Sequence, residues 1–447
     1  MKRLHLPKPK KTVNLSPPKI LALGFLSFIV IGTCLLKLPI SHMGDLSWLN
    51  AFFTATSAVT ITGLSVIPIG QTLTPFGQVV LLSLIQIGGL GFTTFAVLAA
   101  LSLSPNLGLK EQLMVQNTLG QTSLSKATLI AKNVFTYTLF FEALGTIILT
   151  ILWSEKFSFG TALHFALFYS ISAFNNAGFA LTPHGLIDFH RDLSICLTIS
   201  GLYITGGLGF LVLMDLKETR GWKRLSTNSK LVLMTMTVLN ISAFILIWLL
   251  EAHNPNTLGS MPWQDQALNA WIHATVPRSS GFNTLDISQM NHASTLLTIF
   301  LMFIGGGSLS TAGGIKIGTF IVLVFSVITF LRRNDEINIL NYAIPYETAF
   351  KALAVTIITC FLIFIGLFAI LLFEPHKSFI DLLFEVVSAA CTVGLSHGVT
   401  DKLNMPSLLL LTLLMYAGRL GPLTLAYLIA TPKKSRVKHP MTDIQVG

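Results

Sequence analysis

Four short segments that each end in glycine carry the residues best placed to do chemistry in this sequence. They are Thr60-Ile61-Thr62-Gly63, Asn175-Asn176-Ala177-Gly178, Arg278-Ser279-Ser280-Gly281 and Cys391-Thr392-Val393-Gly394. Their glycines are 115, 103 and 113 residues apart, so four related units of similar size fill the chain. The side chains differ among the segments while the glycine recurs, which indicates chemistry of the backbone. Four such strands around one axis would present carbonyl oxygens that can replace the water shell of a cation.

The composition places these segments in a membrane protein. Of the 447 residues, 52% are hydrophobic and only 11% are charged, whereas about 25% are charged in a soluble domain. A membrane-spanning helix needs about 20 apolar residues. Apolar runs of about that length or longer predict eight spans, near residues 20–38, 75–103, 132–153, 193–216, 231–250, 294–331, 349–373 and 406–430.

A shorter apolar run precedes each glycine segment, at residues 48–57, 161–173, 262–275 and 379–390. These runs are too short to cross a bilayer and predict half-crossings whose return strands line a polar path. The predicted fold is therefore an all-α integral membrane protein of four parallel repeats, each with two transmembrane helices and one re-entrant pore helix, around a pseudo-fourfold central pore. The predicted divisions are a basic tail (1–19), four repeats (20–104, 105–217, 218–332 and 333–431) and a second tail (432–447).

The distribution of charge predicts the orientation of the spans. With the N-terminus in the cytoplasm, 21 of the 29 Lys and Arg residues fall on the inner side and five on the outer side. This bias obeys the positive-inside rule. It also accounts for the net charge of +10 without a nucleic-acid partner. Both tails are predicted to be cytoplasmic, and all four half-crossings are predicted to enter from outside.

The second span of each repeat carries a glycine motif 24 to 28 residues after the glycine segment, beginning at Gly88, Gly206, Gly305 and Gly418. In repeats one, two and four, the glycine motif has two possible roles: close packing between helices or lining of the ion path. Repeat three departs from the others, because its motif continues through residue 316 and favours a break in the helix. The residues of this predicted gate loop, 305–316, include Gly305, Gly306, Gly307, Ser308, Thr311, Gly313, Gly314 and Lys316. The other three second spans are expected to be continuous helices.

These motifs resemble those of the Trk/Ktr/HKT potassium-transport superfamily over essentially the whole chain, and most closely those of its Ktr-type, KtrB-like branch. The resemblance implies K⁺-selective uptake through filters lined by the backbone carbonyls of the four glycine segments, with no covalent cofactor and with Na⁺ dependence left open. It implies a gate at the loop of repeat three, opposed by Arg419. It further implies a homodimer in a bacterial plasma membrane, surrounded by lipid. A cytosolic, KtrA-like octameric ring that binds ATP, ADP or another nucleotide would control it.

Charged residues at membrane depth are candidates for functional roles. We expect Arg419 and the gate loop to form a barrier to K⁺. We expect the guanidinium of Arg278 to turn away from the path and pair with Glu385. Glu142 is expected to hold a polar contact between helices, with a partner that the sequence does not identify.

Three other functions are alternatives to Ktr-type K⁺ uptake. A Trk-type H⁺- or Na⁺-coupled subunit would share the same glycine segments. A membrane-embedded enzyme would need a His/Asp/Glu cluster or a nucleophile and base, and the sequence offers no such motif. A transporter of organic solutes more often has inverted repeats, whereas these repeats are parallel.

Overall fold

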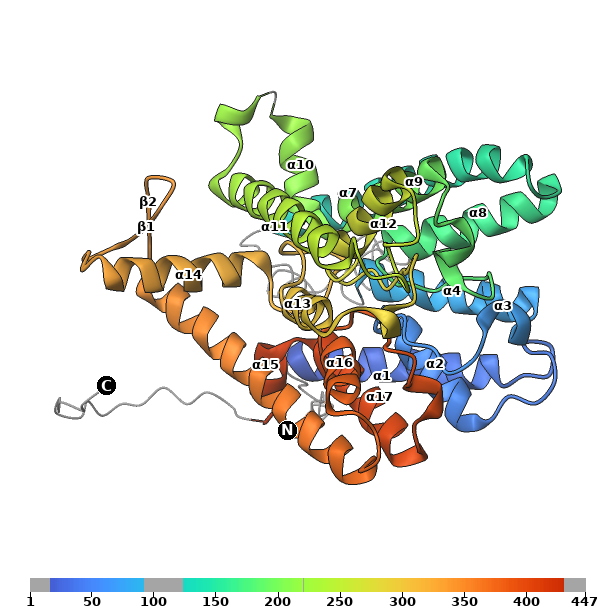
Figure 1. The fold of residues 1–447 in the computed structure, drawn as a ribbon. Coiled ribbons are helices and arrows are strands. Elements are labelled where there is room, and N and C mark those ends of the chain that lie inside the picture. The colour runs from blue at the N-terminus through green and yellow to red at the C-terminus, as the bar shows by residue number, and fades with distance from the viewer. Residues whose placement is uncertain (1–16, 92–123, 220, 430–447) are drawn as a thin grey trace, which may run out of the picture.

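The computed structural model describes residues 17–91, 124–219 and 221–429, which are mostly helical with very little strand (Figure 1). The longer helices are α1 (Pro17–Leu36), α2 (Trp48–Val59), α4 (Pro75–Leu90), α7 (Leu124–Ser154), α8 (Phe159–Phe174), α9 (Leu193–Leu208), α10 (Phe210–Glu218), α11 (Thr227–Glu251), α12 (Trp263–Thr275), α13 (His292–Phe303), α14 (Ile317–Leu331), α15 (Tyr346–Phe373), α16 (Phe379–Ala390), α17 (Met405–Leu420) and α18 (Pro422–Ile429). The short elements are α3 (Ile69–Thr72), the 3-10 turns η1 (Gly185–Phe189), η2 (Trp222–Arg224), η3 (Ile287–Gln289) and η4 (Thr400–Lys402), and an antiparallel hairpin of β1 (Ile337–Ile339) and β2 (Tyr342–Ile344).

The first helix of each predicted repeat is confirmed as α1, α7, α11 or α15. These four are long and apolar enough to cross a membrane, and α9 with α10 forms a further candidate among the described residues. The four shorter runs are confirmed as the helices α2, α8, α12 and α16, each of which ends just before a glycine segment. The chain is a multi-pass membrane protein.

The expectation of continuous second helices is wrong. α9 ends at Gly209, and α10 leaves it at an angle of 94°. α17 ends at Gly421 in the same way, and α4 ends at Gly91, beyond which residues 92–103 of the predicted span lie outside the described residues. All three glycines have positive φ, of 76°, 98° and 83° for Gly91, Gly209 and Gly421, which glycine adopts without a steric penalty.

The same three helices also begin alike. Thr74, Asp192 and Asn404 cap α4, α9 and α17, and each side chain accepts a hydrogen bond from a backbone N–H of the first turn. A polar cap and a left-handed glycine are local start and stop signals. They fix three helices of 16 residues each, which places their glycine motifs at matching depths.

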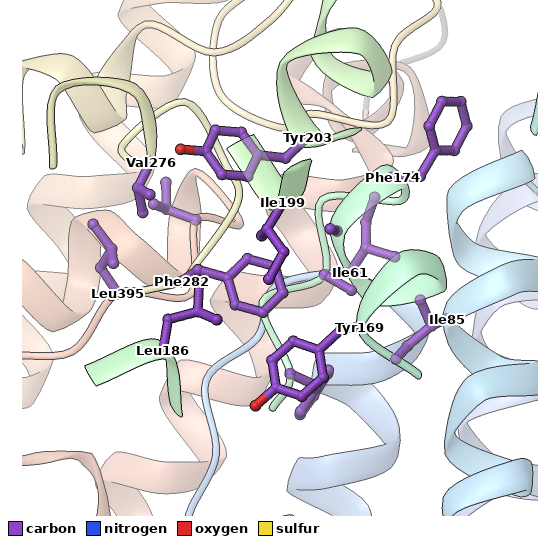
Figure 2. Packing of buried hydrophobic residues seen from close by; sticks show 14 of the residues in the cluster. Ile61, Ile85, Tyr169, Phe174, Leu186, Ile199, Tyr203, Val276, Phe282 and Leu395 are labelled. Atoms are coloured by element: carbon purple, nitrogen blue, oxygen red, sulfur yellow. The ribbon is translucent and has the colours of Figure 1, made fainter. Parts of the chain in front are cut away.

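The repeats surround one shared core. Buried side chains from all four repeats meet there, and Figure 2 shows Ile61, Tyr169, Phe282 and Leu395 gathered around the return strands. The rings of Tyr169 and Phe282 stack at a centroid distance of 6.0 Å. The last repeat returns to the first, because the hydroxyl of Tyr416 in α17 donates to the carbonyl of Ala22 in α1 over 2.7 Å.

Candidate cation site and gate

The four glycine segments share one backbone conformation. The residue two places before each glycine is left-handed, with φ of 48° at Ile61, 56° at Asn176, 70° at Ser279 and 49° at Thr392. The four glycines also have positive φ, between 70° and 96°. Left-handed Ile and Thr are uncommon, and such strain persists only where the surrounding structure imposes it. The repeated strain therefore identifies a turn that the four segments have in common.

Hydrogen bonds from the preceding helix hold three of these turns in the same way. The N–H groups of Thr62, Ala177 and Val393 each donate over 2.8 Å to the carbonyl of a serine in that helix. The serines are Ser57, Ser172 and Ser388. The hydroxyls of Ser57 and Ser388 also accept from the N–H groups of Gly63 and Gly394, at 3.0 and 3.1 Å. The recurrent serine is thus the local sequence signal for this turn.

The four strands meet in a closed ring. A methyl group built on each glycine would lie against the carbonyl oxygen that precedes the glycine of the next strand. The distances are 2.4 Å from Gly63 to Ala177, 2.8 Å from Gly178 to Ser280, 3.1 Å from Gly281 to Val393 and 2.0 Å from Gly394 to Thr62. The order of repeats runs one, two, three, four and back to one. Side chains would not fit at these contacts, so the glycines permit the close approach of the four carbonyls.

The ring suits a dehydrated cation electrostatically. The helices α2, α8, α12 and α16 end immediately before it, and the C-terminal end of a helix carries partial negative charge. Rings of backbone carbonyls can replace the hydration shell of K⁺. Within the described ranges, no three His, Cys, Asp or Glu side chains gather into a metal site. The arrangement fits passage of a cation held by backbone oxygens.

The glycine motifs of repeats one, two and four pack against the pore helices. A methyl group on Gly88, Gly206 or Gly418 would lie 2.0 to 2.3 Å from the carbonyl oxygen of Val59, Phe174 or Ala390. The same contact occurs in all three repeats, so close helix packing accounts for the first glycine of each motif.

The segment 304–316 interrupts the second helix of repeat three, as predicted, between α13 and α14. It folds back on itself, because the N–H of Gly305 donates to Ile315 and the N–H of Ile315 donates to Phe303. It then enters the break in repeat two, where Gly307 donates to the carbonyl of Gly207 over 2.9 Å and Phe210 donates to that of Leu309 over 3.0 Å. The break at Gly209, which was not predicted, thus forms the seat of this loop.

Arg419 faces the loop. Its Nη1 donates to the carbonyl of Thr311 over 3.0 Å, and its Nη2 donates to the carbonyl of Gly88 at the end of α4. One guanidinium therefore joins α17, the loop of repeat three and repeat one. Lys316 donates to the carbonyl of Ala312 over 2.6 Å and lines, together with Arg419, a cavity of about 340 Å³ beside the end of the loop.

The predicted ion pair between Arg278 and Glu385 is wrong. Glu385 accepts hydrogen bonds from the hydroxyls of Ser396 and Thr400 and from the N–H of His397, at 2.6 to 3.0 Å. Arg278 does turn into the protein, where its side chain is buried and its Nη2 donates to the carbonyl of Ala274 over 3.2 Å. The negative end of its own pore helix takes the place of a carboxylate partner.

Glu142 has the role expected of it, and its partners can now be named. Asn175, the first residue of the second glycine segment, donates from Nδ2 to Glu142 Oε1 over 2.8 Å, and Gln86 of α4 donates to Oε2 over 3.2 Å. Asn175 also donates to Gln86 Oε1 over 3.1 Å. The side chain of Glu142 is buried, so this network links α7, α4 and the ring inside the protein.

Replacement of Glu142 by alanine is expected to destabilise the protein. It would remove the acceptor of the half-buried Gln86 amide and one of the three acceptors of the buried Asn175 amide, at a cost of about 1–3 kcal/mol. We expect the midpoint of thermal unfolding of the purified protein to fall by about 1–3 °C, at roughly 1 °C per kcal/mol for a chain of this length. The control Glu155→Ala removes an exposed carboxylate and should leave the midpoint unchanged. Equal midpoints for both variants would argue against a structural network at Glu142.

The helices, the ring of carbonyls and the seated loop define a membrane protein of the cation-transport class. A family model described as TrkH, cation transport protein, matches residues 18–438. The Ktr system potassium uptake protein B of Bacillus subtilis is 41% identical over 444 residues, covering 99% of this chain and 100% of that protein. Its namesake from Vibrio alginolyticus is 37% identical, covering 96% and 95%.

The crystal structure of the potassium transporter TrkH from Vibrio parahaemolyticus has the same fold. It superposes with a TM-score of 0.75 at 19% sequence identity, covering 95% of this chain and 87% of that one. The chain belongs to the TrkH family of cation transport proteins.

Proposed function

We propose that this chain is the ion-conducting membrane subunit of a Ktr-type potassium uptake system. The observation that carries the proposal is the closed ring of four carbonyl oxygens, each set against a glycine of the next strand. Full-length similarity to two proteins named for potassium uptake in a Ktr system gives the ion and the type of system.

In this proposal the four glycine segments are the selectivity filter, residues 60–63, 175–178, 278–281 and 391–394. Each repeat contributes two membrane crossings and one half-crossing, although three of the second crossings contain a bend or end at a left-handed glycine. The excess of Lys and Arg in the tails and inter-repeat loops supports cytoplasmic termini. A bacterial plasma membrane is the proposed location.

The gate is the loop of residues 305–316 with Arg419. Two features support a closed arrangement: the loop is hydrogen-bonded into the Gly209 break, and Arg419 holds it from the opposite side. A buried cation beside the path adds an electrostatic barrier to K⁺. Withdrawal of the loop would require these contacts to break together.

The term "system" in the names of the relatives implies a second component. We propose a homodimer of this chain on a cytosolic octameric ring of nucleotide-binding subunits. Nucleotide binding to that ring would move the loop. Dependence of uptake on Na⁺ is part of the same proposal.

Expression of the wild-type chain with such a partner should restore K⁺ uptake to a bacterium that lacks its own uptake systems. We expect growth at low external K⁺ and uptake of ⁸⁶Rb⁺ that unlabelled K⁺ inhibits and choline does not. The partner expressed alone is the control. Absence of uptake when both subunits are present in the membrane fraction would contradict the proposed function.

A further inference from the structure

A cavity of about 370 Å³ lies between α11, α14, α15 and the β1–β2 hairpin, elements that Figure 1 shows near one another. Cavities of about 300–1,000 Å³ are typical of sites for small ligands. Positions i, i+3 and i+4 of a helix share one face, and α11 and α15 line the cavity in this spacing. The residues are Asn228, Leu231 and Val232 of α11 and Thr348, Lys351, Ala352 and Val355 of α15.

The lining combines an exposed polar end with apolar walls. Asn228, Thr348 and Lys351 are exposed and belong to the first two turns of α11 and α15. Most of the other lining residues are apolar, and the buried ones among them are Val232, Ile321, Ile339 and Ala352. A ligand that satisfies both parts of the cavity must therefore be amphipathic.

The charge of the polar end selects the kind of ligand. Lys351 is the one charged side chain among the described residues that line the cavity. It forms no ion pair with another residue of the described ranges. An ammonium group binds phosphate oxygens strongly, and the hydroxyl of Thr348 and the amide of Asn228 are further donors to such oxygens.

We propose that this cavity binds one anionic phospholipid of the inner leaflet. Its phosphate group would lie at Asn228, Thr348 and Lys351, and part of one acyl chain would lie between the apolar walls. A lysine near the end of a spanning helix suits this ligand, because its ammonium reaches the head groups while its methylene stem covers apolar surface. The inference rests on the proposed function for the cytoplasmic side of these helix ends and for the identity of the gate.

The bound lipid would contact the gate loop. Ser308 of that loop lines the same cavity, and its carbonyl oxygen lies 2.5 Å from a methyl group built on Gly209, at the seat of the loop. Withdrawal of the loop would remove this wall, so the lipid binds better when the loop is seated. A ligand that prefers one of two conformations shifts the equilibrium toward it. Anionic phospholipid would therefore favour the closed gate.

Binding of the lipid can be measured without transport. We expect the purified chain with its partner to retain phosphatidylglycerol in preference to phosphatidylcholine in native mass spectrometry. Lys351→Gln should weaken this binding about tenfold, as expected for the loss of one hydrogen bond between charged groups, and Lys351→Arg should retain it. The control Lys223→Gln removes an exposed lysine that does not line the cavity and should bind as the wild type does.

The effect on the gate is measured as ⁸⁶Rb⁺ flux into proteoliposomes with the partner in its inhibitory state. Flux through the wild-type chain should be at least about fivefold lower with phosphatidylglycerol than in phosphatidylcholine alone, the lower end of typical coupling between two sites. Lys351→Gln should lose this dependence on the lipid, and Lys223→Gln should keep it.

Equal binding of phosphatidylglycerol by the wild type and Lys351→Gln would overturn the site. A wild-type flux that is equal or higher with phosphatidylglycerol would overturn its effect on the gate. If inorganic phosphate added to phosphatidylcholine vesicles lowers the flux as much, the ligand is a soluble anion and the assignment to a lipid is wrong. Absence of flux through the wild-type chain in every lipid would instead refute the proposed function itself.

Discussion

Alanine at position 63 is expected to abolish K⁺ uptake. Gly63 has φ of 96°, and a methyl group there would lie 2.4 Å from the carbonyl oxygen of Ala177. The methyl group and the carbonyl oxygen that it would meet are both fixed to the backbone. Neither can move aside unless one of the two strands shifts and opens the ring. A displacement that costs more than about 1.4 kcal/mol lowers the affinity for the ion at least tenfold. Initial rates of ⁸⁶Rb⁺ uptake, normalised to protein in the membrane, measure the effect.

Gly44→Ala is the control that introduces the strain of a positive φ without a steric clash of the new methyl group. Gly44 has φ of 73° with no atom within 4 Å of a built methyl group. It should therefore retain uptake, although it pays a similar conformational cost. If Gly63→Ala and Gly44→Ala transport equally well, the close ring of carbonyls is not required for conduction.

Removal of the Arg419 side chain is expected to open the gate. Arg419→Ala deletes the donors to Thr311 and Gly88, and each hydrogen bond from a charged group contributes about 1.5–3 kcal/mol. The loop then loses its link to repeat one, and the path loses a buried positive charge. We expect ⁸⁶Rb⁺ flux into proteoliposomes, with the partner in its inhibitory state, to rise by about tenfold to a hundredfold.

Arg419→Lys distinguishes the anchor from the charge. Lysine keeps the positive charge but lacks the planar fork that reaches two carbonyls at once. A flux close to that of Arg419→Ala would identify the anchor as the main restraint, and a flux close to wild type would identify the charge. Unchanged flux in both variants would exclude Arg419 from the gate.

The sequence predicts the positions of the four short helices and of the glycine turns after them, because both depend on local signals. Each glycine segment follows an apolar run of the right length, and the recurrent serine at Ser57, Ser172 and Ser388 holds the turn that directs it. The break in repeat three was also predictable, because Gly305, Gly306 and Gly307 are adjacent and no apolar run continues through them.

The bend at Gly209 and the helix end at Gly421 were not predicted, because the residues beyond each glycine are again apolar and helical. A single glycine in such a run is compatible with a straight helix at a small cost. At Gly209 the bend accommodates the gate loop, which comes from another repeat and donates to Gly207. No local pattern contains that information.

The error at Arg278 has a similar origin. The pair was predicted because a buried arginine needs a partner and Glu385 was an available acid in the fourth pore helix. Glu385 instead uses Ser396, which lies 11 residues further along its own repeat, and Arg278 uses its own helix. The partners of Glu142 belong to two other elements, and only the three-dimensional arrangement identifies them.

The last repeat of the chain closes the ring against the first. Gly394 meets the carbonyl of Thr62, and Arg419 reaches Gly88 across 331 residues of sequence. Contacts so distant in sequence form after the chain between them has been made. During synthesis the first three repeats can enter the bilayer while one side of the ring is missing. If the ring is the proposed ion path, that path is completed only when the fourth repeat has been made, and the same repeat carries the arginine that contacts the gate loop.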